Sequence, residues 1–183
     1  MALCNYRPVV ISMLAGLLLP ACTSVPVKSD YDQEAAFAEY HTVAWLPRDK
    51  DLAASKSLRS LVDVRIKRAI RRTLEAKGHR FIEQGAPDLY VTYHLAIRDR
   101  TTVTPEHYSG FGQTPGATLN IQTYREGTLV IDLIDRAEQH LVWRGWAVGA
   151  VARPDQMEEQ IKAVVAHILS RYPPPQVSTP MTQ

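Results

Sequence analysis

The chain has little cysteine: its 183 residues include only Cys4 and Cys22, both near the N-terminus. A polypeptide that begins at residue 22 keeps one thiol and cannot form an internal disulfide bond. Metal centres built on several cysteines are therefore excluded. The absence of further thiols agrees with an oxidising compartment, in which free thiols are a liability.

The chain also lacks an excess of charge of either sign. It carries 21 Lys and Arg residues against 19 Asp and Glu residues, for a formal net charge of +2. A nearly neutral domain has no overall attraction for a polyanion. We therefore expect no nucleic-acid partner.

Signatures of catalysis are missing as well. No serine stands in a Gly-x-Ser-x-Gly motif, and no glycine-rich loop has the spacing that binds phosphates. Asp132 and Asp135 are three residues apart, so on a strand they point to opposite faces. No histidine pair has the spacing of a helical metal site. We expect neither an enzyme nor a cofactor. The histidines are His41, His79, His94, His107, His140 and His167.

The apolar run at residues 9–19 is too short to cross a bilayer, which needs about 20 residues. Arg7 precedes the run, and Ala21 directly precedes Cys22. A basic start, a short apolar centre and a small residue before the cut are typical of a secretory signal peptide, here residues 1–21. A cysteine at the cut resembles the bacterial lipobox, in which that cysteine carries acyl chains such as palmitate. We expect Cys22 to be the lipidation site.

Two alternatives to lipidation remain open, because Pro20 is not a favoured residue two positions before the cysteine. Cleavage after Ala21 without acylation would leave a soluble periplasmic protein, and an uncleaved segment would act as a short anchor. The lipobox resemblance also implies a location. Thr23 stands where an aspartate would favour retention in the inner membrane. We expect an outer-membrane lipoprotein that faces the periplasm.

The rest of the chain suits a single domain, residues 22–172, followed by a disordered proline-rich tail, 173–183. Apolar residues at spacings of three and four predict amphipathic helices at 57–77 and 155–172, with Gly78 ending the first and an Asp155–Glu158 capping box opening the second. Alternating patterns predict the strands. These are residues 41–46, 79–83, 88–100, 121–135 and 141–151. Residues 23–31 form either a tether or, as we expect, a first edge strand with its proline on the solvent side.

The last two strands predict an antiparallel hairpin. Leu129, Ile131 and Leu133 should share a face with Leu141 and Trp143, which pairs odd-numbered residues with odd-numbered ones. The fold class that follows is α+β, a largely antiparallel sheet with both amphipathic helices packed on one face. The polar stretch 101–118 is expected to be a long loop that can cover the other face.

The face without helices provides the candidate partner surface. Aromatic side chains mixed with a charge pair are typical of recognition surfaces. A plain solvated face is the alternative, with Asp132–Arg144 as a cross-strand ion pair worth under about 1 kcal/mol. The surface consists of Tyr90, His94, Tyr124, Asp132, Arg144 and Trp146, with Phe111 from the loop.

Several segments together resemble the bacterial envelope lipoproteins grouped as domain of unknown function 4136. The resemblance covers residues 22 to about 173, and the late hairpin is its most specific part. It implies an acylated envelope protein with an α+β domain, and it supplies no catalytic residues. The segments that carry it are 31–32, 40–45, 87–91, 127–133 and 141–147.

The expected function is a membrane-anchored lipoprotein with a non-catalytic binding or structural role. Its partners would be the membrane, through the acyl chains, and an envelope protein or glycan. A carrier of lipid or another small ligand is the alternative, with a cavity between sheet and helices, and a hydrolase is a third class. The Leu, Ile and Val residues of the helices favour a filled core over a cavity.

Overall fold

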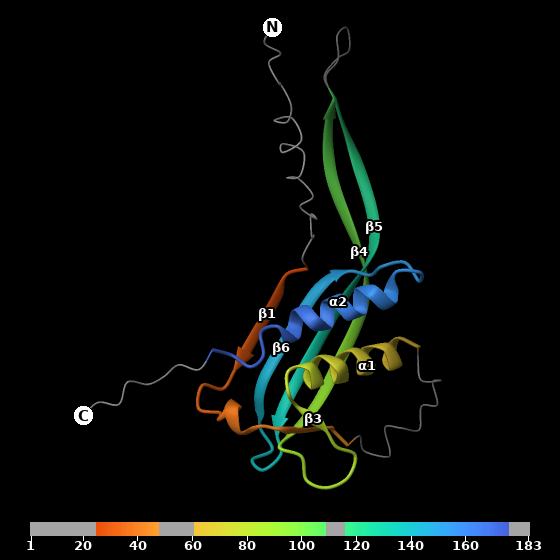
Figure 1. Cartoon of the computed structure of the whole chain (residues 1–183). Helices are drawn as coiled ribbons and strands as arrows, with labels where there is room; N and C mark the ends of the chain where they lie inside the picture. The colour runs from red at the N-terminus through yellow and green to blue at the C-terminus, as the bar shows by residue number, and fades with distance from the viewer. Residues whose placement is uncertain (1–24, 48–60, 109–115, 176–183) are drawn as a thin grey trace, which may run out of the picture.

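The computed structural model describes residues 25–47, 61–108 and 116–175, so the signal segment, Cys22 and Phe111 lie outside the described residues (Figure 1). One six-stranded sheet carries two α-helices on one face. The strands are β1 (Val27–Tyr31), β2 (Thr42–Trp45), β3 (Arg80–Phe81), β4 (Leu89–Tyr108), β5 (Gly116–Asp135) and β6 (Leu141–Ala150). The helices are α1 (Leu61–Ala76), α2 (Met157–Leu169) and a short 3-10 turn, η2 (Phe37–Glu39).

The α+β class is confirmed, with a sheet of mixed strand direction. The strand order is β1-β6-β5-β4-β2-β3. The joins among β1, β6, β5 and β4 are antiparallel, whereas β2 is parallel to both β3 and β4. The parallel joins arise because the chain leaves β2, passes through α1 and returns to the same end of the sheet. A parallel pair needs such a crossover, for which a helix is the usual element.

Asp88 fixes the join between β2 and β4. Its carboxylate accepts hydrogen bonds from the backbone N–H groups of His41 and Thr42 and from the Thr42 hydroxyl, at 2.9, 2.7 and 2.8 Å. Burial acts to raise the pKa of Asp88, but these donors outweigh it and hold that pKa below its usual value. The charged carboxylate therefore joins the first strand of the parallel pair to the start of the second.

The register of the late hairpin is confirmed over most of its length. Leu129 lies opposite Ala147, Ile131 opposite Gly145, and Asp132 opposite Arg144. The expected place of Leu141 in the core is wrong. A bulge sets Leu141 opposite Ile134, so Leu141 is 40% exposed while Val142 is fully buried. One extra residue in a strand reverses the faces of the residues beyond it.

The core lies between the sheet and the two helices. Ile66, Ile70 and Leu74 of α1 and Ile168 of α2 are essentially inaccessible to solvent. They pack over a fully buried central group from the sheet. That group is Val43, Leu89, Val91, Ile131, Leu133 and Trp143.

The helix ends match expectation in one case and not in the other. Gly78, with a φ of 95°, follows the last turn of α1 and allows the chain to leave it. The predicted capping box of α2 is wrong: Gln156 occupies the N-cap without a side-chain hydrogen bond, and Asp155 pairs with Arg153 at 2.9 Å. No helix in the described part of the chain is long and apolar enough to span a bilayer.

The prediction of a loop and lid at residues 101–118 is wrong where the structure describes it. Strand β4 continues to Tyr108 and β5 begins at Gly116, and the two pair throughout. Their outer part, which we call the arm, comprises residues 99–108 and 116–125. The arm projects beyond the body of the sheet instead of folding over a face (Figure 1). Proline and glycine in this stretch suggested a loop, but its many threonines suit a strand.

The start of the predicted tail is part of the packed structure. Pro174 is buried, and the described residues extend to 175. Residues 176–183 lie outside the described residues. The buried residues at the C-terminal end of α2 therefore continue past the predicted boundary at residue 172.

Candidate functional site

The face of the sheet opposite the helices is open and carries the even-numbered residues of the central strands (Figure 1). The register places these residues in rows across four strands. One row reads Lys28, Trp146, Val130 and His94, from β1 to β4. The next row reads Asp30, Arg144, Asp132 and Thr92. Opposite charges thus alternate next to an indole ring.

The pair between Asp132 and Arg144 is the centre of this face. The guanidinium donates through Nε to Oδ1 and through Nη2 to Oδ2, both at 2.7 Å. Asp132 is only 4% exposed despite its place on an open face. The bidentate hydrogen bonds and the charge of Asp132 raise the pKa of Arg144. Because Asp132 is buried, loss of Arg144 would leave a carboxylate without its counter-charge.

His94 lies at the edge of the same cluster. Its Nε2 is 3.9 Å from Oδ2 of Asp132, and the imidazole is mostly exposed. The distance is too long for a hydrogen bond, so His94 is an exposed ring beside an existing ion pair. The cluster offers an imidazole, a guanidinium and a carboxylate to a binding partner.

A shallow hollow of about 560 Å³ opens over this cluster. The hollow is open to solvent, so it can receive part of a larger partner but does not enclose a small ligand. An indole, a guanidinium and a carboxylate offer a stacking surface, donors and acceptors to a polar partner. The residues that line it are Asp30, His94, Val130, Arg144 and Trp146.

The structure brings together four of the predicted surface residues, His94, Asp132, Arg144 and Trp146. Of the other three, two lie elsewhere and one is outside the described residues. Tyr90 is on the same face near the start of β4, opposite Ile134. Tyr124 is opposite Arg100 on the arm, about 26 Å along β5 from Asp132 at ~3.3 Å per residue. Phe111 is outside the described residues.

Sequence reasoning missed the contribution of β1. Asp30 lies opposite Arg144, and Lys28 lies opposite Trp146. The expected edge strand at residues 23–31 had no assigned neighbour, because β1 pairs with a strand more than a hundred residues later. The pattern of one strand does not specify a distant partner.

A second charge cluster stands where the arm leaves the sheet. Glu126 of β5 accepts hydrogen bonds from Arg98 at 2.9 and 2.7 Å and from Arg100 at 3.3 Å. The Arg98 hydrogen bonds lower the pKa of Glu126, partial burial opposes them, and Arg100 adds to the lowering. The root of the arm is thus a charged collar.

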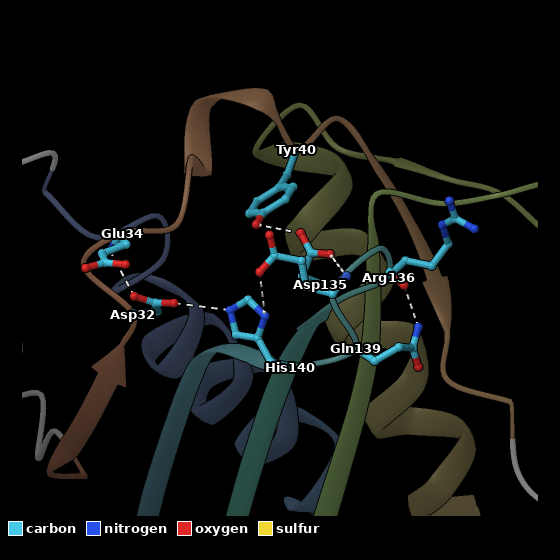
Figure 2. Close-up of polar contacts among 8 residues, drawn as sticks. Asp32, Glu34, Tyr40, Asp135, Arg136, Gln139 and His140 are labelled. Carbon is cyan, nitrogen blue, oxygen red and sulfur yellow. Dashed lines mark hydrogen bonds and ion pairs between the residues drawn. The ribbon is translucent and has the colours of Figure 1, made fainter.

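The opposite end of the molecule holds a network of polar side chains (Figure 2). The Tyr40 hydroxyl donates to Oδ2 of Asp135 at 2.9 Å, and the Glu138 N–H donates to Oδ1 of Asp135 at 2.8 Å. Burial and the nearby Asp135 raise the pKa of Tyr40. Partial burial acts to raise the pKa of Asp135, but the donors hold it below its usual value. The phenol therefore stays protonated and the carboxylate charged.

His140 completes this network between two carboxylates. Its Nε2 is 3.1 Å from Asp32, and its Nδ1 is 3.2 Å from Glu138 (Figure 2). The contacts connect the turn between β5 and β6 to the segment after β1. Because these groups are paired to one another, the network holds the turn against that segment.

An apolar cavity of about 90 Å³ lies between the helices and the sheet, next to the root of the arm. Small residues on the sheet, among them Gly127, Ala147 and Gly149, leave this space. The expected filled core is therefore incomplete at this end. The described residues contain no group of three His, Cys, Asp or Glu side chains able to hold a metal ion.

The family comparison gives one match. The model of the family described as "Domain of unknown function (DUF4136)" matches residues 27–174 of this chain. The match covers every strand and helix of the described structure. No curated protein matches the chain.

Solved structures similar to this chain include a PDZ domain protein from Parabacteroides distasonis, with a TM-score of 0.55 and 15% identity. The match covers 81% of this chain and 35% of that one, so this chain spans about a third of that protein. At this identity the likeness shows the fold alone. PelC from Paraburkholderia phytofirmans, solved as a dodecamer, matches 80% of this chain and 96% of its own, with 12% identity and a TM-score of 0.44.

Proposed function

The chain belongs to the family described as domain of unknown function 4136, and from this premise we propose that it is an envelope lipoprotein without catalytic activity. In this proposal acyl chains on Cys22 anchor the domain to the membrane, on the periplasmic side of the outer membrane. The open face of the sheet then binds another envelope component, a protein or a glycan.

The observation that carries the binding role is the hollow on the open face. Both helices cover one side of the sheet, and the other side presents Trp146 beside the Asp132–Arg144 pair. A large aromatic ring at the rim of an ordered ion pair is typical of a recognition surface. A polar partner could stack on the indole and compete for the donors of Arg144.

The anchoring role is supported by the order of residues at the N-terminus. Arg7, the apolar run 9–19, Ala21 and Cys22 have the arrangement of a lipoprotein signal. One acyl chain binds a membrane only marginally, while several chains hold a protein firmly. The bacterial modification implied by the lipobox adds three chains, so the domain would stay on its membrane.

Radiolabelled palmitate tests the anchor. The wild-type chain should incorporate the label and float with membranes, and a Cys22→Ser variant should do neither. Cys4→Ser, within the segment to be removed, is the matched control and should behave as wild type. Equal labelling of the wild type and Cys22→Ser would refute acylation at this residue.

Photo-crosslinking in intact cells tests the binding face. A photoreactive residue at Trp146 should give a discrete adduct in the envelope. The same residue at Ala163, exposed on α2, should not give that adduct. Arg144→Ala should weaken the Trp146 adduct, because the pair orders that face. An identical pattern from both positions would argue against the open face as the binding site.

The cavity beside α2 does not favour the carrier alternative. Its 90 Å³ is well below the 300–1,000 Å³ of small-molecule sites. A lipid would not fit without separation of the helices from the sheet. We therefore propose the binding protein and not the carrier.

A further inference from the structure

The arm has one apolar face and one polar face. Val103 lies opposite Ile121, and Pro105 lies opposite Leu119. Val103, Leu119 and Ile121 are 52%, 67% and 64% exposed, which is high for large apolar side chains. The other face carries Thr102 opposite Gln122, along with Thr104, Asn120 and Glu106. This alternation is that of a ribbon with one buried face, yet no described residue covers it.

The outer arm is also poor in charge. Across residues 101–106 and 116–124 the only ionised group is Glu106, which accepts a hydrogen bond from Asn120 at 2.9 Å. The charges gather at the root, in Arg98, Asp99, Arg100, Arg125 and Glu126. An exposed ribbon normally carries charges that keep it soluble and unpaired. The outer arm instead has the composition of a surface that is covered and shielded from bulk water.

The arm is long for a ribbon of two strands that nothing else supports. Beyond the Asp99–Arg125 pair, β4 and β5 pair only with each other as far as Tyr108 and Gly116. This stretch of the arm is about 30 Å long at ~3.3 Å per residue. A two-stranded hairpin alone is marginally stable in water. An apolar face of this length is therefore expected to rest on something.

The first described residue, Val25, lies near the root of the arm. Val25 lines the apolar cavity together with Ile97, at the root of the arm and on the arm's apolar side. A side chain added at Gly149 would lie 3.2 Å from the Val25 side chain, which places Val25 against β6 at this end. Cys22 is three residues earlier, so it can be no more than about 11 Å from Val25. The first described residues and the arm therefore lie at the same end of the sheet, and Val25 is on the side of the arm's apolar face.

We propose that the apolar face of the arm lies in the head-group region of the bilayer that holds the acyl anchor. This inference rests on the proposed lipid anchor. Val103, Leu119 and Ile121 enter the boundary between head groups and acyl chains, and the polar face stays in water. The charged collar of Arg98, Arg100 and Glu126 lies on the polar face of the ribbon and stays in water with it.

The ribbon lies along the surface and does not cross the membrane. Each outer edge of the arm has unpaired N–H and C=O groups, which are not tolerated in the hydrocarbon core without a closed barrel. Side chains that enter about 5–10 Å, as interfacial helices do, leave these groups hydrated. The arm and the acyl chains then hold the domain at two points and orient its open sheet face.

The mature chain offers a clean test because its single thiol, Cys22, would be blocked by acylation. Ile121→Cys and Gln122→Cys are adjacent exposed positions on the apolar and polar faces of the arm. Each full-length acylated variant is labelled with an environment-sensitive nitrobenzoxadiazole probe. Each is then reconstituted in phosphatidylethanolamine–phosphatidylglycerol vesicles with a spin-labelled lipid as quencher.

The Ile121 probe should shift its emission to the blue and lose intensity with the quenching lipid, and the Gln122 probe should do neither. Vesicles that float with the protein but affect both probes equally would refute the membrane contact and leave the lipid anchor standing. Protein that fails to float would refute the anchor and, with it, the inference. Thiol crosslinks between copies at Ile121→Cys, with no lipid quenching, would assign the apolar face to a second copy and overturn the proposal.

Discussion

Gly145 shows at the scale of one residue how tightly the core is built around Trp143. A side chain at this position would lie 2.3 Å from the indole and 2.7 Å from a methyl group of Ile168. The absence of a side chain therefore allows the ring to lie between the sheet and α2. The tryptophan and the glycine two residues later form one packing unit.

Gly145→Ala is expected to lower the free energy of unfolding by about 1–3 kcal/mol, because the added methyl group overfills a packed core. Urea unfolding of the acyl-free Cys22→Ser chain measures the change. Gly127→Ala is the matched control, since its new side chain would meet the end of Val151 at a less severe 3.2 Å. Equal losses in both variants would show that the contact with Trp143 is not the cause.

Tyr172 is a buried residue at which a substitution is expected not to destabilise the fold. The centre of its ring is 5.5 Å from the centre of the Trp143 ring and 5.4 Å from that of His79. Burial raises the pKa of its phenol. The hydroxyl has no hydrogen-bond partner among the described residues. Tyr172→Phe should therefore leave stability unchanged or raise it by up to about 1 kcal/mol, since an unsatisfied buried group opposes folding.

Thermal unfolding of Tyr172→Phe and Tyr172→Ala separates the ring from its hydroxyl. The alanine variant should lose about 3–5 kcal/mol, as expected for an aromatic residue removed from a core. A loss in the phenylalanine variant comparable with that of the alanine variant would contradict the assignment of the hydroxyl as unsatisfied.

At the scale of elements, the network around Asp135 holds the β5–β6 turn against the segment that follows β1 (Figure 2). The donors from Tyr40 and Glu138 favour the charged form of Asp135, so its pKa is lower in the folded chain than in the unfolded one. A group of this kind adds stability above its unfolded pKa, near 3.8, and the addition is lost as the pH falls through the folded pKa.

Asp135→Asn should therefore destabilise the acyl-free chain by about 1 kcal/mol at pH 7 and by progressively less at pH values below about 4. Urea unfolding of both proteins across this range gives the difference. Asp99→Asn, on the exposed arm, is the control for loss of one charge. A difference that stays constant down to pH 2 would contradict the ionised hydrogen bonds as its source.

The elements that the sequence predicts best are those whose pattern is local. Alternation through Leu129, Ile131 and Leu133 predicts the hairpin register, because one face must be buried. The bulge at Val142 escapes such reasoning, since its cause lies in how the two strands meet. The sequence predicts only part of the candidate hollow for the same reason. Arg144 and Asp132 belong to one hairpin and were predicted to be neighbours, whereas Asp30 belongs to a strand that is distant in the sequence.

At the scale of the whole molecule, the two ends of the sheet have different characters. The polar network closes the end at the β5–β6 turn, and the arm and the start of β1 share the other end. The outer arm lies outside the core: beyond Arg125, whose backbone C=O accepts from the Val151 N–H at 2.9 Å, the described residues of β4 and β5 pair only with each other. The folded body and the arm should therefore separate in stability measurements.

Replacement of residues 101–123 by Asn-Gly joins the opposed residues Arg100 and Tyr124 with a two-residue turn that suits a hairpin. The free energy of unfolding of this acyl-free variant should stay within about 1 kcal/mol of the intact chain, as for changes away from a core. Circular dichroism and urea unfolding measure the outcome. A loss of several kcal/mol would show that the arm supports the body after all.

The position of β1 at the sheet edge beside β6 also affects the order in which the strands can pair. A polypeptide is synthesised from its N-terminus, and domains begin to fold as their segments emerge. Val27 finds its partner only when Ala147 has been made, because the neighbour of the first strand is the last one. The beginning of the domain must therefore wait, unpaired, for nearly the whole chain before it can be incorporated into the sheet.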